Sequence, residues 1–176
     1  MNNHSNKVTS ADKQQERRET ALWIVGFTDG EGCFSISMFR NKTTAHGWQV
    51  FPEFVVTQGD KSKHVLDEMQ SFFDCGSVVI NKRYDNHTEH IYRYCVRKLE
   101  DLQTHIIPFF EENNLRTAKQ NDFILWKEVI MMMALKEHTD MKGLIKIAKL
   151  IEKMNRKKPS KFLESSETKR QVRESE

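Results

Sequence analysis

The spacing of apolar side chains changes abruptly near residue 31. Over residues 21–30 apolar and small residues recur at helical spacing, whereas residues 33–38 alternate between small or polar side chains and large apolar ones. The first pattern predicts a short helix, and the second predicts a strand with one buried face. We therefore expect a helix that turns directly into a strand.

Glycines mark this helix and its end. Gly26 and Gly30 lie four residues apart and share one helical face, although a glycine inside a helix costs roughly 1 kcal/mol relative to alanine. One reason for such glycines is the close approach of a second backbone to that face. The other interpretation is a buried helix that ends in a glycine cap beside a solvated acid.

The remaining apolar pattern predicts three more strands and four more helices. Strands are expected at Trp48–Gln58, Ser77–Arg83 and Ile91–Lys98, and helices at Asp60–Phe73, Leu99–Phe110, Ala118–Leu135 and Met141–Met154. Pro52 indicates a bulge or an edge position, Asp60 an N-cap, and Pro108 a bend in its helix. The predicted fold class is α+β, in the order α-β-β-α-β-β-α with a four-stranded antiparallel sheet and C-terminal helices.

Composition separates a core from two polar ends. The first twenty residues are polar and mixed in charge, which predicts a flexible leader, with the alternative that Asp12 to Glu19 extend the first helix. The expected segments are a leader over 1–20, one domain over 21–163 with its core at 21–135 and a basic helical extension at 136–163, and a disordered tail over 164–176.

Composition also excludes several protein classes. The chain has 176 residues and 38% hydrophobic content, which is enough for a single-domain core. Its three cysteines lie far apart and form no Cys-x-x-Cys, so neither a disulfide framework nor a zinc site is indicated. No apolar run approaches the roughly 20 residues of a membrane span, and no signal-peptide core is found. We expect no membrane partner and an intracellular protein that is not secreted, in a mitochondrion or chloroplast if eukaryotic and in the cytoplasm if bacterial.

Positive charge is concentrated near the C-terminal end. Net charge is only +3, which is a weak indication of a polyanionic partner. Residues 141–163, however, hold eight Lys or Arg against the single acid Glu152. Such a run is usually a solvated face, and a membrane surface or a calmodulin-type partner is also compatible with it.

The segment Gly26-Phe27-Thr28-Asp29-Gly30-Glu31-Gly32 resembles the signature of the LAGLIDADG homing endonucleases. The resemblance implies a half-domain with a curved sheet, whose motif helix packs against a second motif helix and sends its last acid into the active site. Because this chain holds one copy of the motif, we expect a homodimer. The expected dimer contacts are Ala21, Leu22, Val25, Gly26 and Asp29.

The resemblance also implies catalytic roles. Glu31 is expected to bind a metal with help from the Gly30 carbonyl, and oxygen ligands beside a phosphate favour Mg²⁺. Gln58 is expected to orient solvent, and Lys119 to approach the scissile phosphate, with Arg116 as a competitor for that role. Asp29 is expected to be structural. In a DNA-binding fold, the basic C-terminal run is expected to contact phosphate.

One face of the sheet is expected to contact double-stranded DNA in the major groove. Alternation along the predicted strands places a set of side chains on that face, and arginines there pair well with guanine. The expected DNA-contacting residues are Ser35, Ser37, Asn41, Gln49, Glu53, Val55, Asn81, Arg83, Arg93 and Arg97.

Three functions are compatible with these features. The first is a Mg²⁺-dependent homing endonuclease that makes a double-strand break at a long, near-palindromic site. The second is a nucleic-acid-binding protein of the same fold that does not cut, such as an intron RNA maturase or a regulator. The third is a helix-sheet interaction protein without a nucleic-acid partner. The first two differ in whether Glu31 and Gln58 are needed.

Overall fold

The strands form one antiparallel sheet in the order β1-β2-β4-β3 in the computed structural model, which describes residues 10–81, 90–154 and 161–164. The strands are β1 (Gly32–Arg40), β2 (Trp48–Gly59), β3 (Ser77–Asn81) and β4 (Ile91–Val96). The helices are α1 (Ser10–Glu31), α2 (Lys63–Phe73), α3 (Leu99–Asp101), α4 (Ile107–Glu112), α5 (Lys119–Ala134) and α6 (Met141–Lys153). The short turns are η1 (Asp60–Ser62), η2 (Leu102–Ile106) and η3 (Glu137–Thr139). The predicted α+β fold class and the order of its elements are confirmed.

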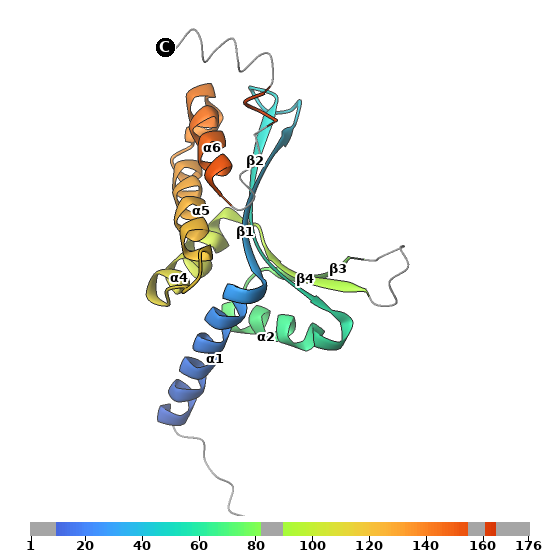
Figure 1. Ribbon diagram of the computed structural model, residues 1–176, viewed down its shortest axis with the longest axis vertical. Helices are drawn as coiled ribbons and strands as arrows, with labels where there is room; N and C mark the ends of the chain where they lie inside the picture. Colours follow the sequence, from blue (N-terminus) through green and yellow to red (C-terminus); the bar gives the residue numbers. More distant parts are fainter. Residues whose placement is uncertain (1–9, 82–89, 155–160, 165–176) are drawn as a thin grey trace, which may run out of the picture.

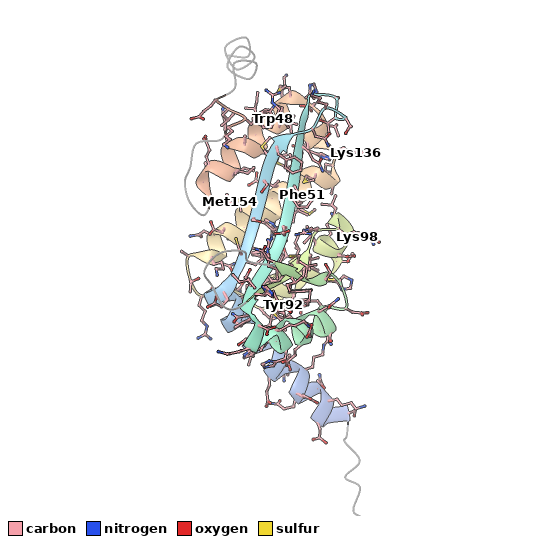
Figure 2. The ribbon with its side chains drawn as sticks, turned by 90° about the vertical axis from the view of Figure 1, so that its right-hand side faces the viewer. Trp48, Phe51, Tyr92, Lys98, Lys136 and Met154 are labelled. Carbon is pink, nitrogen blue, oxygen red and sulfur yellow. The ribbon has the colours of Figure 1, made fainter. Side chains whose placement is uncertain are left out.

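The sheet consists of two strands at the hairpin end and of four strands at the other end. β1 and β2 form an extended hairpin, and β4 and β3 continue the sheet beside the second half of β2 (Figure 1). α5 and α6 lie along one face of the hairpin, α2 lies beneath the β4 half, and α1 leaves from the start of β1 (Figure 1). Figure 2 shows the sheet from another side, with the strands in front of these helices. We call the face turned away from α5 the outer face.

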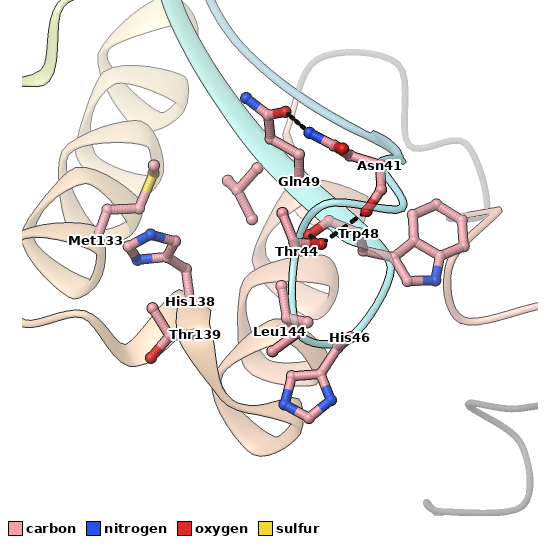
Figure 3. A pocket seen from close by; sticks show the side chains of 11 residues that line it. Asn41, Thr44, His46, Trp48, Gln49, Met133, His138, Thr139 and Leu144 are labelled. Carbon is pink, nitrogen blue, oxygen red and sulfur yellow. Dashed lines mark hydrogen bonds between the residues drawn. The ribbon is translucent and has the colours of Figure 1, made fainter.

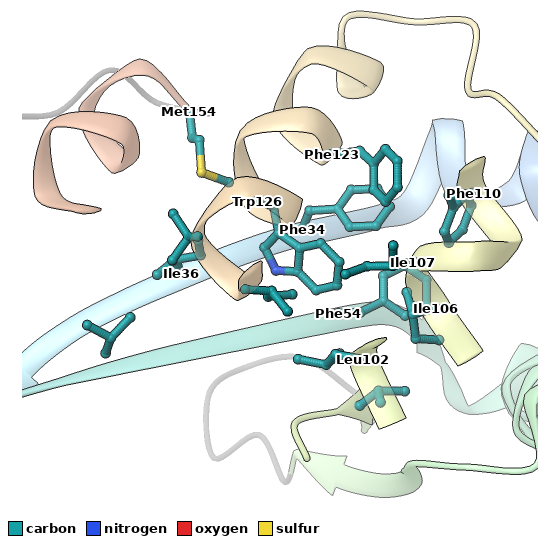
Figure 4. Packing of buried hydrophobic residues seen from close by; sticks show 14 of the residues in the cluster. Phe34, Ile36, Phe54, Leu102, Ile106, Ile107, Phe110, Phe123, Trp126 and Met154 are labelled. Carbon is teal, nitrogen blue, oxygen red and sulfur yellow. The ribbon is translucent and has the colours of Figure 1, made fainter. Parts of the chain in front are cut away.

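Phe34 of β1 is the centre of the hydrophobic core. Its ring centroid lies 5.2 Å from the rings of Phe54, Phe110, Phe123 and Trp126, which come from β2, α4 and α5 (Figure 4). All five side chains are at most 2% exposed. Aromatic pairs at this separation add stability beyond the area they bury. The core therefore fixes α4 and α5 against the inner face of the sheet.

Pro52 lies in a central strand but at a locally unpaired edge. It faces Ile36 on β1, whereas pairing with β4 begins only at Phe54. The missing N–H of Pro52 therefore removes no bond to β4. The predicted edge position is confirmed, and the continuous register between β1 and β2 shows that there is no bulge.

α1 is longer than the predicted motif helix. It begins at Ser10, so the alternative in which Asp12 to Glu19 extend the helix is the observed one. Its exposed first turns are tied to the body where Arg17 lies over the ring of Phe72, 4.7 Å from the ring centroid. Among the described residues, none of the helices combines the length and the apolarity needed to cross a bilayer.

The predicted helix over residues 99–110 is interrupted by a π-helical turn. α3 passes through this turn, η2, into α4, and Pro108 lies in the first turn of α4. Proline has no N–H to bond the carbonyl four residues earlier, and a π turn is one way for a helix to absorb the lost bond. The expected disturbance at Pro108 is thus confirmed, in a form that periodicity does not specify.

Two helix starts differ in how they are capped. Asp60 opens the turn η1, and the side chain of the residue before α2, Ser62, makes no cap hydrogen bond, so the expected Asp60 cap is wrong. Asp140, by contrast, accepts a hydrogen bond from the Gly143 amide and caps α6. α6 begins at its predicted start, Met141, next to this local cap, and ends one residue before its predicted end.

Candidate functional site

Glu31 is exposed at the point where α1 passes into β1. The next residue, Gly32, is buried and already belongs to the strand. A Cβ at position 32 would lie 2.6 Å from Thr28 Cγ2 and 2.9 Å from the Thr28 carbonyl oxygen, so a side chain does not fit there. Gly32 therefore permits the sharp turn that leaves Glu31 at the end of the helix.

Asp29 bonds to the segment that precedes α5. One carboxylate oxygen accepts the Arg116 amide at 2.7 Å, and the other accepts the Thr117 amide at 3.3 Å and the Thr117 hydroxyl at 2.7 Å. Partial burial acts to raise the pKa of Asp29, but these hydrogen bonds and the charge of Lys119 outweigh it and hold the pKa below its usual value. Asp29 thus has the structural role that was predicted for it.

Lys119 reaches back to the end of α1. Its ammonium donates a 2.7 Å hydrogen bond to the Thr28 carbonyl, one of the last carbonyls of that helix. Burial lowers the pKa of Lys119, and the nearby groups Cys33, Asp29 and Glu31 oppose that shift. The ammonium therefore lies in the electrostatic neighbourhood of Glu31 and is stabilised by the negative end of the α1 dipole.

Gln58 lies at the same end of the sheet as Glu31. Gly32 pairs with Val56 on β2, two residues before Gln58, and Gln58 pairs with Tyr92 on β4. Gln58 is half-buried and makes no side-chain hydrogen bond to another residue in the described part of the chain. The structure thus places Glu31, Lys119 and Gln58 around the junction of α1 with the sheet.

Arg116 is the predicted competitor of Lys119. Its backbone amide is bound by Asp29, and its side chain is exposed. Because only the Lys119 ammonium is attached to the end of α1 by an observed hydrogen bond, the geometry favours Lys119 as the cation beside Glu31.

The oxygen atoms near Glu31 suit a hard metal cation whose remaining ligands are waters and phosphate oxygens. Within the described ranges, no three His, Cys, Asp or Glu side chains gather in a manner that could hold a metal ion. Glu31 offers one exposed carboxylate, and the neighbouring Gly30 offers a carbonyl at the end of a helix. Mg²⁺ is commonly held by one or two carboxylates together with waters and substrate phosphates, so this donor set fits it.

One face of α1 is apolar and has no partner in the described structure. Leu22 is 67% exposed and Trp23 is 37% exposed, and Trp23 stacks on Phe27 with ring centroids 4.9 Å apart. Both Gly26 and Gly30 are exposed, and a Cβ at either position would meet nothing within 4 Å. This face, formed by Leu22, Trp23, Gly26 and Gly30, is open to a second helix, and we call it the glycine face.

Two expected dimer contacts have other partners. Val25 is 8% exposed and belongs to the hydrophobic core of its own chain, so the structure does not support its expected place in the interface. The carboxylate of Asp29 is bound to residues 116 and 117 of the same chain. Ala21 is half-buried. Trp23, which is not among the expected contacts, is also exposed on this helix, at 37%.

The outer face of the sheet carries most of the expected DNA contacts at accessible positions. Ser37, Asn81 and Arg97 are exposed, whereas Ser35, Asn41, Gln49 and Arg93 are half-buried. Arg83 lies outside the described residues. Glu53 and Val55 are only 6% and 7% exposed, so direct contact of these two side chains with DNA is not supported. Alternation predicted the face correctly but not how neighbouring side chains cover it.

The hairpin end of the sheet borders a cavity of about 510 Å³. Asn41 donates a 2.6 Å hydrogen bond to Gln49 on the hairpin side, and His138 and Met133 line the helical side (Figure 3). Burial lowers the pKa of His138. None of Glu31, Gln58 and Lys119 lines this cavity, so it is separate from the candidate active site.

α6 exposes a row of lysines on the side away from its core contacts. The exposed residues recur at helical spacing, and they are Lys142, Lys146, Lys149 and Lys153. α6 packs on α5, which covers the inner face of the sheet. The row therefore does not lie on the outer face, and its contact with phosphate stays a prediction.

Sequence comparison identifies the family of this chain. Residues 24–130, more than half of the chain, match the family described as LAGLIDADG endonuclease. A Neurospora crassa protein named "Probable intron-encoded endonuclease 2" is 32% identical over 128 residues, which are 73% of this chain and 26% of that protein. A Mycosarcoma maydis protein named "Probable intron-encoded DNA endonuclease 1" is 34% identical over 99 residues, 56% of this chain and 33% of that protein. The chain thus spans about a quarter to a third of these relatives.

Solved structures give the same result. The homing endonuclease I-TnaI is 35% identical with a TM-score of 0.70, and the alignment covers 89% of this chain and 97% of that one. The I-LtrWI LAGLIDADG homing endonuclease, whose structure is bound to target DNA, is 29% identical with a TM-score of 0.72, and 77% of this chain covers 44% of that one. Sequence, fold and the glycine-marked helix agree, and the chain belongs to the LAGLIDADG endonuclease family.

Proposed function

We propose that this chain is a site-specific DNA homing endonuclease, which hydrolyses phosphodiester bonds in both strands of a long, near-palindromic target as a homodimer. The observation that carries the proposal is the exposed Glu31 at the end of α1, with the ammonium of Lys119 attached to the same helix end. An acid and a cation at the same helix end are suited to a reaction at a phosphate.

Lys119, Asp29 and Gln58 have different roles in the proposed hydrolysis. Lys119 keeps two ammonium hydrogens beyond the one given to the Thr28 carbonyl, and these neutralise charge that builds up on a phosphate. Asp29 fixes the segment before Lys119 and so limits its movement. Gln58 presents an amide at the same end of the sheet, which both donates and accepts hydrogen bonds and orients a water.

Glu31 and the Gly30 carbonyl would hold Mg²⁺ in this proposal. Bound there, the ion would place positive charge against phosphate oxygens and make a water more acidic. Support comes from the exposure of Glu31 and from the type of donor atoms present.

Pairing of two chains supplies the second half of the site. The glycine face of α1 has room for the backbone of another helix, and Leu22 and Trp23 are apolar residues left in solvent. The chain also corresponds to a little under half of the DNA-bound structure it resembles, at 44%. A second copy seated on the glycine face brings two Glu31 side chains together, one for each DNA strand.

The outer face of the sheet supplies the DNA-binding surface. It carries Arg93, Arg97 and several hydroxyl and amide side chains, which suit the hydrogen-bonding pattern of the major groove. Two relatives are named as intron-encoded endonucleases, one of them as a DNA endonuclease, which supports a target in DNA. An intracellular, organellar site of action is a further part of the proposal.

The test is a cleavage and binding assay on one variant. The chain is used to select cleaved sites from a library of random palindromic duplexes with Mg²⁺ present, and the recovered site is then the substrate. Glu31→Gln is expected to bind that site with the affinity of the unaltered chain and to leave both strands intact. Cutting by Glu31→Gln would refute the assignment of Glu31.

Two further results would redirect the proposal. Sequence-specific nucleic-acid binding without cutting by the unaltered chain, at any Mg²⁺ concentration, would identify a binder such as an intron RNA maturase. DNA affinity that does not change with salt would exclude a phosphate-contacting surface, because counterion release makes such binding fall steeply as salt rises.

A further inference from the structure

Two arginines and one glutamate form an ion-pair cluster on the outer face of the sheet. Arg93 Nη2 donates to Glu53 Oε1 at 2.6 Å, and Arg97 Nε donates to Glu53 Oε2. The side chain of Glu53 is 8% exposed, whereas those of Arg93 and Arg97 are 33% and 42% exposed. One buried carboxylate thus holds two guanidinium groups that remain open to solvent.

The register shows how the cluster is built. Val55 of β2 pairs with Cys95 of β4, and Arg93 pairs with Thr57, further along the strands from Glu53. To reach Glu53, the side chain of Arg93 must run past Val55 and Cys95. This explains why these two outer-face residues are only 7% and 2% exposed. An arginine side chain that follows this path lies along the sheet, and its stem contributes to the burial of both residues.

Arg97 is held from two sides. Besides its hydrogen bond to Glu53, its guanidinium carbon lies 5.8 Å from the ring centroid of Phe51. The hydrogen bond from Arg97 to Glu53 is the main cause that raises the pKa of Arg97. Phe51 also packs against Phe39 of β1, with ring centroids 6.1 Å apart. The position of Arg97 is therefore set by β1, β2 and β4 together.

The cluster presents free donors to a base, whereas its acceptor, Glu53, is buried. A guanidinium has five N–H donors. Arg97 donates from Nε to Glu53, so both of its terminal nitrogens remain available to donate to a base. Arg93 spends Nη2 and keeps Nη1 and Nε. Both oxygens of Glu53 are bound. Guanine offers N7 and O6, two adjacent acceptors in the major groove that match such a pair of donors.

We infer that Glu53 is a positioning residue that holds Arg93 and Arg97 as a preformed pair, and that this pair reads guanine in the DNA target. The inference rests on the proposed function and adds a specificity determinant to it. Ordering one long side chain on binding costs roughly 2- to 13-fold in affinity. Glu53 lowers that cost by ordering both arginines before DNA arrives.

Two other roles of Glu53 predict different results. If Glu53 only joined β2 to β4, its replacement would lower the stability of the fold and leave base preference unchanged. If Glu53 itself accepted a hydrogen bond from cytosine, its replacement would change the preference at a cytosine. The readout must therefore be base preference at defined positions of the site, measured beside thermal unfolding.

The experiment compares Glu53→Gln with the unaltered full chain. The site selected by the unaltered chain is measured without divalent metal, together with duplexes in which each guanine is replaced in turn. We expect the unaltered chain to prefer one or two guanines by roughly 5- to 150-fold each. Glu53→Gln is expected to lose at least about fivefold of that preference, while its affinity for random DNA stays equal or rises because a negative charge is removed.

A matched control makes the same chemical change elsewhere. Glu111 accepts a 2.8 Å hydrogen bond from Lys127 of α5 and is exposed, so Glu111→Gln also breaks an ion pair. It is expected to leave guanine preference unchanged. Should Glu53→Gln fail to fold, Arg97→Lys replaces it, since lysine keeps the charge but lacks the planar pair of donors. It is expected to lose the same preference.

The outcomes separate the inference from the proposed function. An unaltered chain that binds no duplex refutes the proposed function. A chain that binds and cuts its site, but whose guanine preference survives Glu53→Gln, refutes the positioning role alone. A selected site whose recognition does not depend on any guanine also refutes it.

Discussion

Asp29 and Thr117 are joined by a 2.7 Å hydrogen bond from the hydroxyl to the carboxylate, although they lie 88 positions apart in the chain. Lys119 completes the junction between α1 and α5, since it donates to the Thr28 carbonyl on the same helix end. An acid of α1 thus meets the amides that precede α5, and a cation of α5 meets the carbonyl end of α1. The negative carboxylate lies at the positive, N-terminal end of α5, and the positive ammonium lies at the negative, C-terminal end of α1, so the helix dipoles favour both contacts.

We expect Asp29→Asn to weaken this junction. Hydrogen bonds to a charged acceptor are stronger than those to an amide, so stability should fall by about 1 kcal/mol, or about 2–4 °C in Tm for a chain of this size. Cleavage should fall while DNA affinity is kept, because the segment before Lys119 loses its anchor. Thermal unfolding and a cleavage assay of the same preparation check both effects.

The pH dependence gives the sign of the Asp29 contribution. Its pKa in the folded chain lies below the ordinary 3.8, so the ionised carboxylate stabilises the fold fully above pH 3.8. The difference in Tm between the unaltered chain and Asp29→Asn should shrink as pH falls below 3.8 and through the lower folded value. A difference that grows on acidification would contradict the contribution of the ionised form.

Lys119 should give cleavage an alkaline limit. Burial holds the pKa of Lys119 below the 10.5 of a free lysine, so its ammonium is lost at a lower pH than usual. The kcat/KM for cleavage, which reflects the free enzyme, should fall as pH rises through that value. Lys119→Met should lower cleavage at every pH and leave DNA affinity within a few-fold.

Lys119→Arg is the matched control for this limit. Arginine stays charged to pH values above 12, so the alkaline fall should vanish, while the rate at neutral pH drops because the Thr28 contact is shaped for an ammonium. An unchanged alkaline limit in Lys119→Arg would assign the titration to another group.

Local pattern predicted much of this fold because much of it is local. The switch from helical to strand period between residues 30 and 33 marks the end of α1 to within one residue, and the amphipathic pattern from Met141 marks the start of α6. Resemblance to the family signature is what singles out Glu31, Lys119 and Gln58 in the sequence, since periodicity alone gives none of them a role. The contacts of Lys119 and Asp29 are visible only in the fold, because their partners lie some ninety residues away.

The sequence did not predict the direction that the long arginine side chains take across the sheet. It also did not predict which apolar side of α1 is buried. Alternation places Glu53 and Val55 on the outer face, but it does not say that Arg93 lies across that face and pairs with Glu53. Similarly, α1 carries apolar residues on two sides. Val25 faces the core and Leu22 faces solvent, and helical period alone assigns neither.

The aromatic centre of the core should be costly to remove. Phe34 is fully buried and lies 5.2 Å from four other rings, so Phe34→Ala leaves a cavity that several elements line. Such a change typically costs about 3–5 kcal/mol. Denaturant unfolding should show this loss, whereas Phe39→Ala, at a side chain 43% exposed on the outer face, should cost much less.

The two glycines at positions 26 and 32 should respond to substitution in opposite ways. A Cβ at Gly26 meets nothing within 4 Å, and leucine is a better helix former than glycine by roughly 1 kcal/mol, so Gly26→Leu should keep or raise the stability of the single chain. On the glycine face, however, its side chain would separate two packed helices. Sedimentation should therefore show Gly26→Leu as a monomer with reduced cleavage. Gly32→Ala should instead lower Tm, because its methyl group would collide with Thr28. A Gly26→Leu chain that still forms a dimer would show that the pairing surface lies elsewhere.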